Sequence, residues 1–254
     1  KIHLKINTGL NRQGIKVSEV SEFLNELKKY PKLDLEGVCS HFISSEDSGK
    51  DDLTRQQENL FLQALQIIRS YGFNPKYIHI SNSAGAIKTQ NSKIYNAIRL
   101  GLGLYGINPI PSKDFVFIKL QNLKPALTFW STLIHKINLQ KGDGVSYGST
   151  FVADRDMTIG LIPVGYYEFF SRRLSNRGYV SFQDKFLPLV GNICMNLSMC
   201  SLEEVDVQVG DRIKIISSNP EDLNSVYHIA NLNETITYEV LVKLAESIRR
   251  VVMS

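Results

Sequence analysis

Residues 35–40 read Leu-Glu-Gly-Val-Cys-Ser, residues 53–71 read Leu-Thr-Arg-Gln-Gln-Glu-Asn-Leu-Phe-Leu-Gln-Ala-Leu-Gln-Ile-Ile-Arg-Ser-Tyr, and residues 77–81 read Tyr-Ile-His-Ile-Ser. The two outer stretches are short apolar runs typical of strands. The long middle stretch repeats apolar residues at helical spacing, with one predicted face made of Leu60, Ala64, Leu65 and Ile68. A strand, a helix and a strand in this order predict parallel pairing through a right-handed crossover.

The same alternation extends in both directions from this unit. Residues 2–6 predict a strand, residues 97–100 another, and a short helix is expected from Ser83. Ser18 is expected to cap a further helix whose apolar positions are Val20, Phe23, Leu24 and Leu27. The pattern is typical of a doubly wound sheet or a β/α barrel. Barrel enzymes assemble their sites where strands end, and the polar residues at these ends are Lys5, Asn7, His41, Asn82, Ser83 and Arg99.

From Pro125 the sequence changes to short β-rich runs separated by turn signals such as Lys-Gly-Asp-Gly. These runs are residues 127–139, 157–163, 179–182, 187–199 and 212–216. Residues 238–252 predict a closing amphipathic helix, with apolar positions Leu241, Leu244, Ala245, Ile248 and Val252. We therefore expect a partial β/α barrel over residues 1–122 and a mostly antiparallel β domain over residues 123–254. A whole barrel takes ~250 residues, so the first segment is long enough for about half of one.

The composition favours a protein that binds small molecules or other subunits. Lys and Arg number 29 against 25 Asp and Glu, for a net charge of +4, and no block of like charge predicts a nucleic-acid or membrane partner. No apolar stretch approaches the ~20 residues of a membrane span. Cys39, Cys194 and Cys200 lack metal-ligand spacing, so we expect free thiols, no metal site and a cytoplasmic protein.

Seven short motifs carry a family resemblance. They are Lys5-Ile-Asn-Thr-Gly-Leu-Asn-Arg12-Gln-Gly14, Ser40-His41-Phe42, Asn82-Ser83-Ala84, Arg99-Leu-Gly101-Leu-Gly-Leu-Tyr105-Gly106, Val145-Ser-Tyr147-Gly148, Gly165-Tyr166 and Cys194-Met195. Their order and spacing resemble those of bacterial alanine racemases, pyridoxal-phosphate enzymes of fold type III. The resemblance covers the whole chain. It implies the C-terminal part of a (β/α)8 barrel followed by a β domain, pyridoxal 5'-phosphate as cofactor, and a homodimer whose active sites are shared between subunits.

The implied activity is the interconversion of L- and D-alanine, which supplies D-alanine for peptidoglycan. Racemisation removes the Cα proton and returns one on the opposite face, so two bases must flank the substrate. By resemblance, Tyr147 is the base for the L-enantiomer and reaches the cofactor of the neighbouring subunit. His41 and Arg99 are the expected positive neighbours that favour its phenolate. Without the motif, Tyr147 is more typical of a half-buried strand tyrosine whose hydroxyl bonds a backbone group, and the motif reverses that preference.

The resemblance also implies the cofactor contacts. Arg99 faces the pyridine nitrogen, and because a guanidinium keeps its protons, it leaves that nitrogen unprotonated. The phosphate is held by the Ser83 hydroxyl, the backbone N–H groups of Gly101 and Leu102, and Tyr238. From the residues alone, Arg99 is typical of a surface or capping position and Tyr238 of a core aromatic.

The substrate contacts implied by the resemblance involve four residues. Arg12 and the backbone N–H of Met195 bind the amino-acid carboxylate, and Tyr166 narrows the entrance. Lys5 matches a lysine that is carbamylated in some members, where the resulting anion orients the arginine. The alternative for Lys5 is an unmodified lysine at a strand edge, with its stem on apolar surface.

Three departures from the family pattern affect what the chain can do. Asn7 and Asn196 stand where aspartate is usual, and residues 167–169 read Tyr-Glu-Phe in place of Ala-Asp-Gly. No stretch matches the segment with the cofactor-binding lysine, and Lys243 has the wrong neighbours, so we expect the isolated chain to be inactive. The alternatives are a broader amino-acid racemase, a decarboxylase, which Tyr147 and Arg99 argue against, and a non-catalytic binding module.

Overall fold

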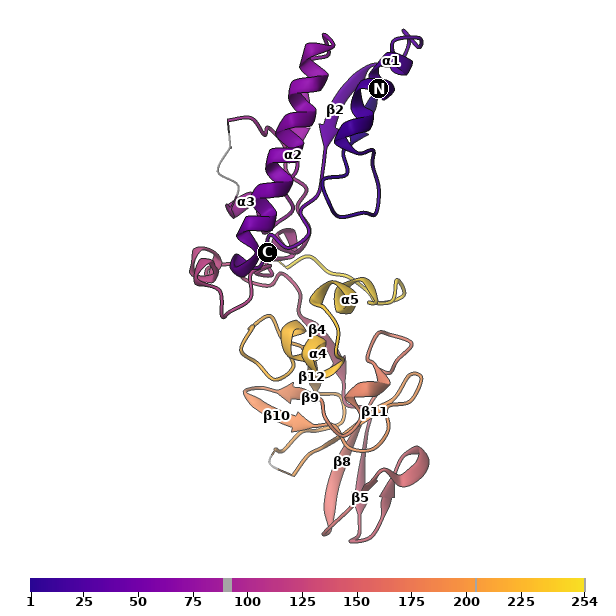
Figure 1. The fold of residues 1–254 in the computed structure, drawn as a ribbon. Helices are drawn as coiled ribbons and strands as arrows, with labels where there is room; N and C mark the ends of the chain where they lie inside the picture. Colours follow the sequence, from indigo (N-terminus) through magenta and orange to yellow (C-terminus); the bar gives the residue numbers. More distant parts are fainter. Residues whose placement is uncertain (89–92, 204, 254) are drawn as a thin grey trace. The chain divides into compact units, whose positions relative to one another are not determined.

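The chain folds into two compact units, residues 1–123 and 124–254. The structure is a computed structural model that describes residues 1–88, 93–203 and 205–253 (Figure 1). No helix within these described ranges is both long and apolar enough to cross a membrane. Cys39 and Cys194 are half-buried and Cys200 is buried, and all three are free thiols, which confirms the expectation from their spacing.

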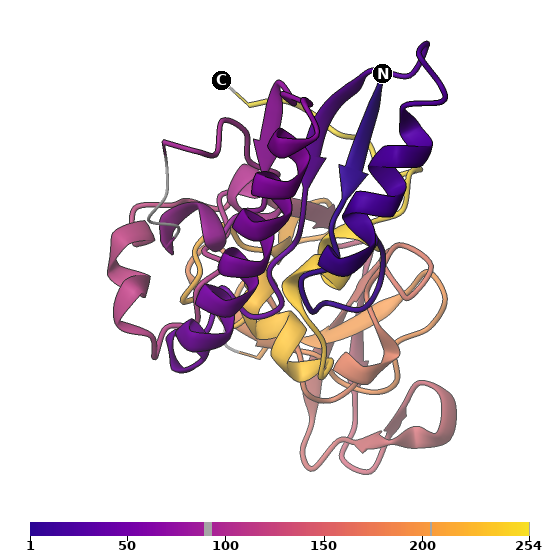
Figure 2. The same cartoon turned by 45° about the horizontal axis from the view of Figure 1, so that its top comes forward.

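The first unit is a parallel sheet with helices packed on it. Its strands and helices are β1 (Ile2–Lys5), α1 (Val20–Leu27), β2 (Leu35–Cys39), α2 (Asp51–Ser70), β3 (Tyr77–His79) and α3 (Gly85–Lys88). The sheet order is β1-β2-β3 and both pairings are parallel, as the alternation of strands and helices predicted. Figure 2 shows α1 and α2 together in front of these strands.

The core of the first unit lies between this sheet and the inner faces of α1 and α2. Val20, Leu24 and Leu27 are buried on α1 at helical spacing. The buried positions of α2 are Gln57, Phe61, Ala64, Leu65 and Ile68. Leu60 was expected on this face but is exposed, and Phe61 packs in the core instead. Neighbouring helix positions lie about 100° apart and the other three predicted positions are buried, so the spacing found the helix but misplaced one edge of its buried face.

Two further expectations for the first unit were wrong. Ser18 does not cap α1: it lies inside a 3₁₀ turn, Val17–Glu19, where the Glu19 carboxylate accepts a hydrogen bond from the Lys16 backbone N–H. Residues 97–100 form no strand. They run beside β3, with the Asn96 and Arg99 amides donating to the carbonyls of Ile78 and Ser81, both at 3.1 Å. These two hydrogen bonds are too few to form a β ladder, yet they fix the backbone of Arg99 beside the end of β3.

The second unit is built of antiparallel sheets followed by two helices. Its elements are β4 (Phe129–Thr132), β5 (His135–Leu139), β6 (Gly144–Val145), β7 (Phe151–Val152), β8 (Met157–Ile162), β9 (Tyr179–Phe182), β10 (Lys185–Pro188), β11 (Ser198–Ser201), β12 (Arg212–Ile216), α4 (Val226–Leu232) and α5 (Thr237–Val242). The sheet orders are β10-β9-β12-β4, β11-β8-β5 and β6-β7, and every pairing is antiparallel. The predicted antiparallel architecture is confirmed.

Buried apolar side chains of β8 and β11 join Val145 and Val190 in one core cluster. On the pair of β4 and β12, Trp130 contacts two cations, with Arg212 4.8 Å and Lys214 5.2 Å from its ring centroid. Both are cation–π distances, so the cationic side chains of β12 cover the indole.

The expected closing helix over residues 238–252 is mostly absent. Helix α5 ends at Val242, and of the predicted apolar face Leu241 is buried while Val252 is 97% exposed. The Ala245 amide donates to the Glu168 carbonyl at 3.3 Å, outside the helix. This tertiary hydrogen bond replaces the helical one, which is why apolar spacing alone overestimated the helix.

Candidate active site

The end of β2, the end of β3 and the segment leading to Arg99 meet around one guanidinium. Nη2 of Arg99 donates to the carbonyl oxygens of Ser40, at 2.6 Å, and Ile80, at 3.1 Å. It also lies 3.0 Å from Nδ1 of His41, while Nη1 contacts Nδ1 of His79. A guanidinium has only donors, so both imidazoles accept from it. Arg99 is therefore held in a single place by two strand ends.

The charge around Arg99 is positive and uncompensated. Among the described residues, none of Lys5, Arg12 and Arg99 forms an ion pair with a carboxylate. Burial lowers the pKa of Lys5, and the charges of Arg99 and Arg12 lower it further against an opposing effect of Cys39. Burial also lowers the pKa of Arg99. Cations gathered without internal counter-ions make a site that attracts an anion.

The two histidines beside Arg99 are neutral near neutral pH. Burial lowers the pKa of His41 to about 4, with further contributions from Arg99, Lys5 and Arg12. The same cause, followed by Arg99, lowers the pKa of His79 to about 4. This lowered pKa argues against a positive charge on His41, and its role beside Tyr147 stays a prediction. His79 was missed by the sequence reasoning, although it lies inside the strand predicted at residues 77–81; in the structure it is the last residue of β3.

A side chain of α2 fixes the loop that carries His41. The buried Gln57 donates through Nε2 to the His41 carbonyl at 3.1 Å and accepts at Oε1 from the Ile43 amide at 2.9 Å. The carboxamide thus satisfies two backbone groups of the loop after β2. This contact joins two elements and was not visible in the sequence.

Arg12 lies on a tight loop that returns to β1. The Asn7 carboxamide oxygen accepts from the amides of Gly9 and Asn11, both at 3.1 Å, which is an Asx-type turn. Gly14 adopts a φ of +98°, and a Cβ there would lie 2.7 Å from the Lys5 carbonyl oxygen. Asn7 therefore keeps the turn-forming oxygen of the usual aspartate but not its charge. The loop leaves Arg12 exposed after β1. The charge of Arg12 is near enough to Lys5 to lower the pKa of Lys5.

Ser83 collects backbone donors from the glycine-rich stretch. Its Oγ accepts from the Gly101 amide at 2.9 Å and from the Gly103 amide at 3.3 Å. Gly101 directly precedes the 3₁₀ turn Leu102–Tyr105. A hydroxyl and two amides that converge on one point, next to a short helical turn, are the donor set that a phosphate group needs. The residues of this unit fit a phosphorylated, anionic cofactor.

Tyr147 projects from a strained turn in the second unit. It opens the 3₁₀ turn Tyr147–Ser149, is 72% exposed, and follows Ser146, whose φ is +62°. Two hydrogen bonds to Asn192 fix the turn: Ser146 Oγ donates to the Asn192 carbonyl at 2.7 Å, and Asn192 Nδ2 donates to the Tyr147 carbonyl at 2.6 Å. The backbone strain is local, and it is balanced by these bonds.

The loop bearing Tyr166 and the loop bearing Met195 are in direct contact. The Tyr166 amide donates to the Cys194 carbonyl at 3.1 Å, and the Tyr167 amide donates to the Met195 carbonyl at 2.9 Å. A Cβ on Gly165 would lie 2.2 Å from the Cys194 oxygen, so only glycine allows this approach. Tyr166 and Met195 are both exposed. Two motifs separated by almost thirty residues in the sequence thus form a single surface feature, which we call the 165/195 seam.

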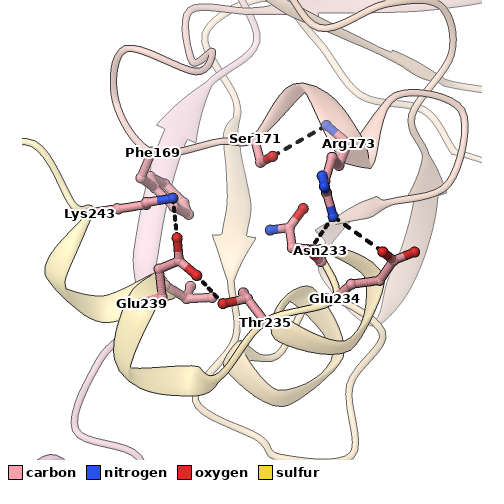
Figure 3. Close-up of a pocket in the computed structure, with 9 residues that line it drawn as sticks. Phe169, Ser171, Arg173, Asn233, Glu234, Thr235, Glu239 and Lys243 are labelled. Carbon is pink, nitrogen blue, oxygen red and sulfur yellow. Dashed lines mark hydrogen bonds and ion pairs between the residues drawn. The ribbon is translucent and has the colours of Figure 1, made fainter.

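Tyr238 lies in the first turn of α5 and is partly exposed. A pocket of 300 Å³ in the second unit was not predicted; it is lined by Phe169, Ser171, Arg173, Asn233, Glu234, Thr235, Glu239, Val240 and Lys243. Figure 3 shows that its charges are paired: Arg173 contacts Glu234, and Lys243 contacts Glu239. The predicted site residues lie outside the lining of this pocket.

The chain has a parallel β/α unit with an anion-attracting end, followed by an antiparallel β unit. This arrangement is typical of the class of proteins in which barrel strands precede a β domain. Comparison with models of protein families shows which family of this class the sequence matches. The alanine racemase N-terminal domain matches residues 1–109, and the alanine racemase C-terminal domain matches residues 126–252. The chain belongs to the alanine racemase family, and its fold is part of the family's β/α barrel followed by the β domain.

Individual relatives agree with this assignment. Alanine racemase of Lactobacillus acidophilus is 38% identical over 257 residues, which cover 99% of this chain and 65% of that protein. The crystal structure of alanine racemase from Streptomyces lavendulae, a producer of D-cycloserine, superposes with a TM-score of 0.90 at 28% identity, covering 100% of this chain and 66% of the other. That of Bacillus anthracis, with bound L-Ala-P, gives 0.85 at 29% identity, covering 96% and 62%. The chain spans 65% of the length of the curated relative it matches from Lactobacillus acidophilus.

Proposed function

We propose that this chain carries the cofactor- and substrate-holding residues of an enzyme that interconverts L- and D-alanine with pyridoxal 5'-phosphate, and so supplies D-alanine for peptidoglycan. One observation carries the proposal: Lys5, Arg12 and Arg99 gather without a carboxylate partner among the described residues, in the unit where amide donors converge on Ser83. Such a site favours a phosphorylated cofactor together with an amino-acid carboxylate. The free thiols fit a cytoplasmic protein.

The first unit would hold the cofactor through contacts of three kinds. The Ser83 hydroxyl and the amides of Gly101 and Leu102 would bind the phosphate. Arg99 would donate to the ring nitrogen, and His41, neutral and bonded to Arg99, would keep the guanidinium in place. When bound, pyridoxal phosphate supplies an electron sink that weakens the Cα–H bond of an amino acid. The role of Tyr238 as a further phosphate donor stays a prediction from the resemblance.

The substrate carboxylate would be bound by Arg12 and by the Met195 amide, and Tyr166 would limit the space near it. Lys5 supports a further step. Its lowered pKa increases the fraction of neutral amine, and the neutral amine is the form that reacts with carbon dioxide to give a carbamate. The carbamate would place an anion beside Arg12 and restrain its orientation. These assignments rest on the resemblance together with the electrostatics of the first unit.

Tyr147 would take the Cα proton of L-alanine in the site of a partner subunit of a homodimer. Its exposed phenol on a fixed turn supports this role, because a base must present its oxygen to the reacting atom while its backbone stays still. The second base is expected to be the cofactor-binding lysine, which has no match in this sequence. Lys243 is paired with Glu239 and is a poor substitute.

A broader amino-acid racemase is the second candidate. The observation that favours it is Phe169, which stands where the family usually has glycine and has a φ of +124°. The ring is buried against Phe129 and Phe170, at centroid distances of 5.4 and 5.8 Å. A bulky residue at this φ changes the turn after Tyr166 and with it the space for a substrate side chain.

The decisive test replaces Tyr147 with phenylalanine in the full-length protein. We expect turnover of L-alanine to fall by roughly 10²–10⁴-fold, the usual contribution of a general base, while cofactor absorbance and thermal stability stay unchanged. Tyr167→Phe is the matched control, because Tyr167 is a similarly exposed tyrosine without an assigned role. Equal turnover in Tyr147→Phe and the parent would remove Tyr147 from the mechanism. A parent that racemises serine as fast as alanine would favour the second candidate.

A further inference from the structure

One carboxylate ties the two sides of the 165/195 seam. Glu168 accepts at Oε2 from the Gly165 amide at 2.8 Å and at Oε1 from Asn196 Nδ2 at 2.8 Å. Gly165 precedes Tyr166, and Asn196 follows Met195. The two oxygens of one side chain therefore hold the Gly165 backbone on one side of the seam and the Asn196 side chain on the other, in addition to the main-chain bonds already described.

The geometry of this pair favours an amide at residue 196. An ionised carboxylate has acceptors only, so the group facing Oε1 must be a donor. An aspartate at position 196 would place a second carboxylate at hydrogen-bond distance from Glu168, and like charges at that distance repel strongly. Within the described residues, Glu168 has no ion pair with a lysine or arginine that could offset such repulsion. The glutamate at position 168 and the asparagine at position 196 are thus complementary.

The pair adds to main-chain bonds that already shape this segment. The seam bonds fix the carbonyl groups of Cys194 and Met195, and the Cys194 amide donates to the Leu197 carbonyl at 2.9 Å, while residues 195–197 are exposed. For the Asn196 side chain, Glu168 is the hydrogen-bond partner that the described residues provide. The turn that carries the amide of Met195 is therefore held by the seam bonds and, through the side chain of the residue that follows it, by Glu168.

We propose that Glu168 and Asn196 form a positioning pair that sets the Met195 backbone against Tyr166 and thereby tunes the affinity for the substrate carboxylate and the side-chain size accepted. This inference rests on the proposed function. Neither residue touches the reacting atoms, so both act through Met195 and Tyr166. Loss of the pair raises KM and relaxes the preference for alanine over larger amino acids, while kcat changes little.

The test uses Asn196→Asp, Glu168→Gln and the double exchange in the full-length protein. Asn196→Asp is expected to raise KM for alanine by about tenfold, the effect of losing one hydrogen bond to a charged group. Glu168→Gln alone is nearly neutral, because the Asn196 carboxamide can turn to present its oxygen.

The double exchange restores KM to within about twofold, because it reverses the direction of the hydrogen bond and keeps the bond itself. The introduced glutamine amide donates to the introduced aspartate carboxylate, and the glutamine oxygen still accepts from the Gly165 amide. A general loss of structure would not be rescued in this way.

Hydrogen–deuterium exchange provides a readout that does not depend on activity. Asn196→Asp should speed exchange in peptides that cover residues 165–170 and 193–198, with no change over residues 35–81, and the double exchange should reverse it. A parent that does not racemise alanine would refute the proposed function, yet deuterium exchange would still test the pair. Unchanged deuterium exchange and KM in Asn196→Asp, or a defect that the double variant fails to correct, would overturn the inference.

Discussion

His79 shows how one buried ring can order its neighbours. Because Arg99 can only donate, Nδ1 of His79 accepts from it, and the neutral ring must carry its proton on Nε2. That nitrogen lies 3.3 Å from Nδ1 of His3 on β1. Gly37 on β2 leaves room for the contact, since a Cβ there would meet the His3 ring at 2.5 Å. The tautomer of His79 is therefore set from both sides.

This arrangement makes the stability of the protein depend on pH. The folded pKa of His79 is about 4, below the ~6.5 of an unfolded chain, so between these values only the unfolded state takes up the proton. We expect the urea midpoint to fall as pH drops through this window. His79→Gln should flatten the dependence, because glutamine can accept from Arg99 but does not titrate. Identical pH profiles for His79→Gln and the parent would show that His79 titrates normally. His3, which contacts His79, and His41, which contacts Arg99, remain in both proteins, so the difference between the profiles reports on His79.

At this scale the sequence predicted which residue types gather at the strand ends, but not their charges. Arg99 and His41 were expected together and lie 3.0 Å apart. The neutrality of His41 could not be inferred, because it follows from burial and from Arg99, Lys5 and Arg12, which depend on the fold. Gln57 was missed for the same reason. An amide on a helix face gives no hint in sequence of the loop that it holds.

Between elements, a buried charge network joins the start of α2, the end of α3 and the segment at Asp114. Lys88 and Asp114 are 8% and 7% exposed, with Nζ and Oδ2 3.6 Å apart. The backbone and hydroxyl of Ser48 donate to Asp114 at 2.7 and 2.8 Å. Burial raises the pKa of Asp114, but hydrogen bonds from Val116 and Ser48 and the charge of Lys88 outweigh it, and the pKa is about 2. The carboxylate is therefore ionised.

Lys88→Met should destabilise the protein by about 3 kcal/mol, because it leaves a buried carboxylate without its cation. Lys50→Met is the matched control: Lys50 pairs with Asp47 at 3.3 Å but is mostly exposed, and such pairs contribute about 0–1 kcal/mol. Urea unfolding of both variants measures the difference, and Lys88→Met/Asp114→Asn should recover part of the loss. Equal effects of the two single changes would contradict the role of the network.

Elements were predictable where apolar periodicity decides them. The strands at residues 179–182 and 212–216 have the predicted bounds, and the parallel and antiparallel halves follow from element order. The prediction failed beyond Val242, where the Ala245 amide bonds to Glu168. It also failed at residues 97–100, where one bond from Asn96 to β3 and one from Arg99 to Ser81, just past β3, replace a full ladder. In both places a few long-range contacts outweigh local spacing, and a sequence pattern does not record such contacts.

For the molecule as a whole, the proposed chemistry needs a base that these residues do not supply. We expect the 254 residues alone to show no alanine racemisation in either direction. Borohydride reduction in the presence of pyridoxal phosphate, followed by peptide mapping, should find no lysine labelled in preference to the others. Supplying the remaining third of a full-length relative in trans should restore activity if the pieces close one barrel. An active isolated chain with one specifically labelled lysine, such as Lys243, would contradict this expectation.

The cation-covered indole of Trp130 has a practical consequence. It is the single tryptophan of the chain, and it belongs to the second unit. Intrinsic fluorescence excited at the indole therefore reports on the β4–β12 sheet alone, whereas far-ultraviolet dichroism reports on the helices of both units. Superimposable transitions from the two signals would mean that the units melt as one cooperative body, and separated transitions would give each unit its own stability. Trp130 is thus an intrinsic fluorescent probe for the second unit.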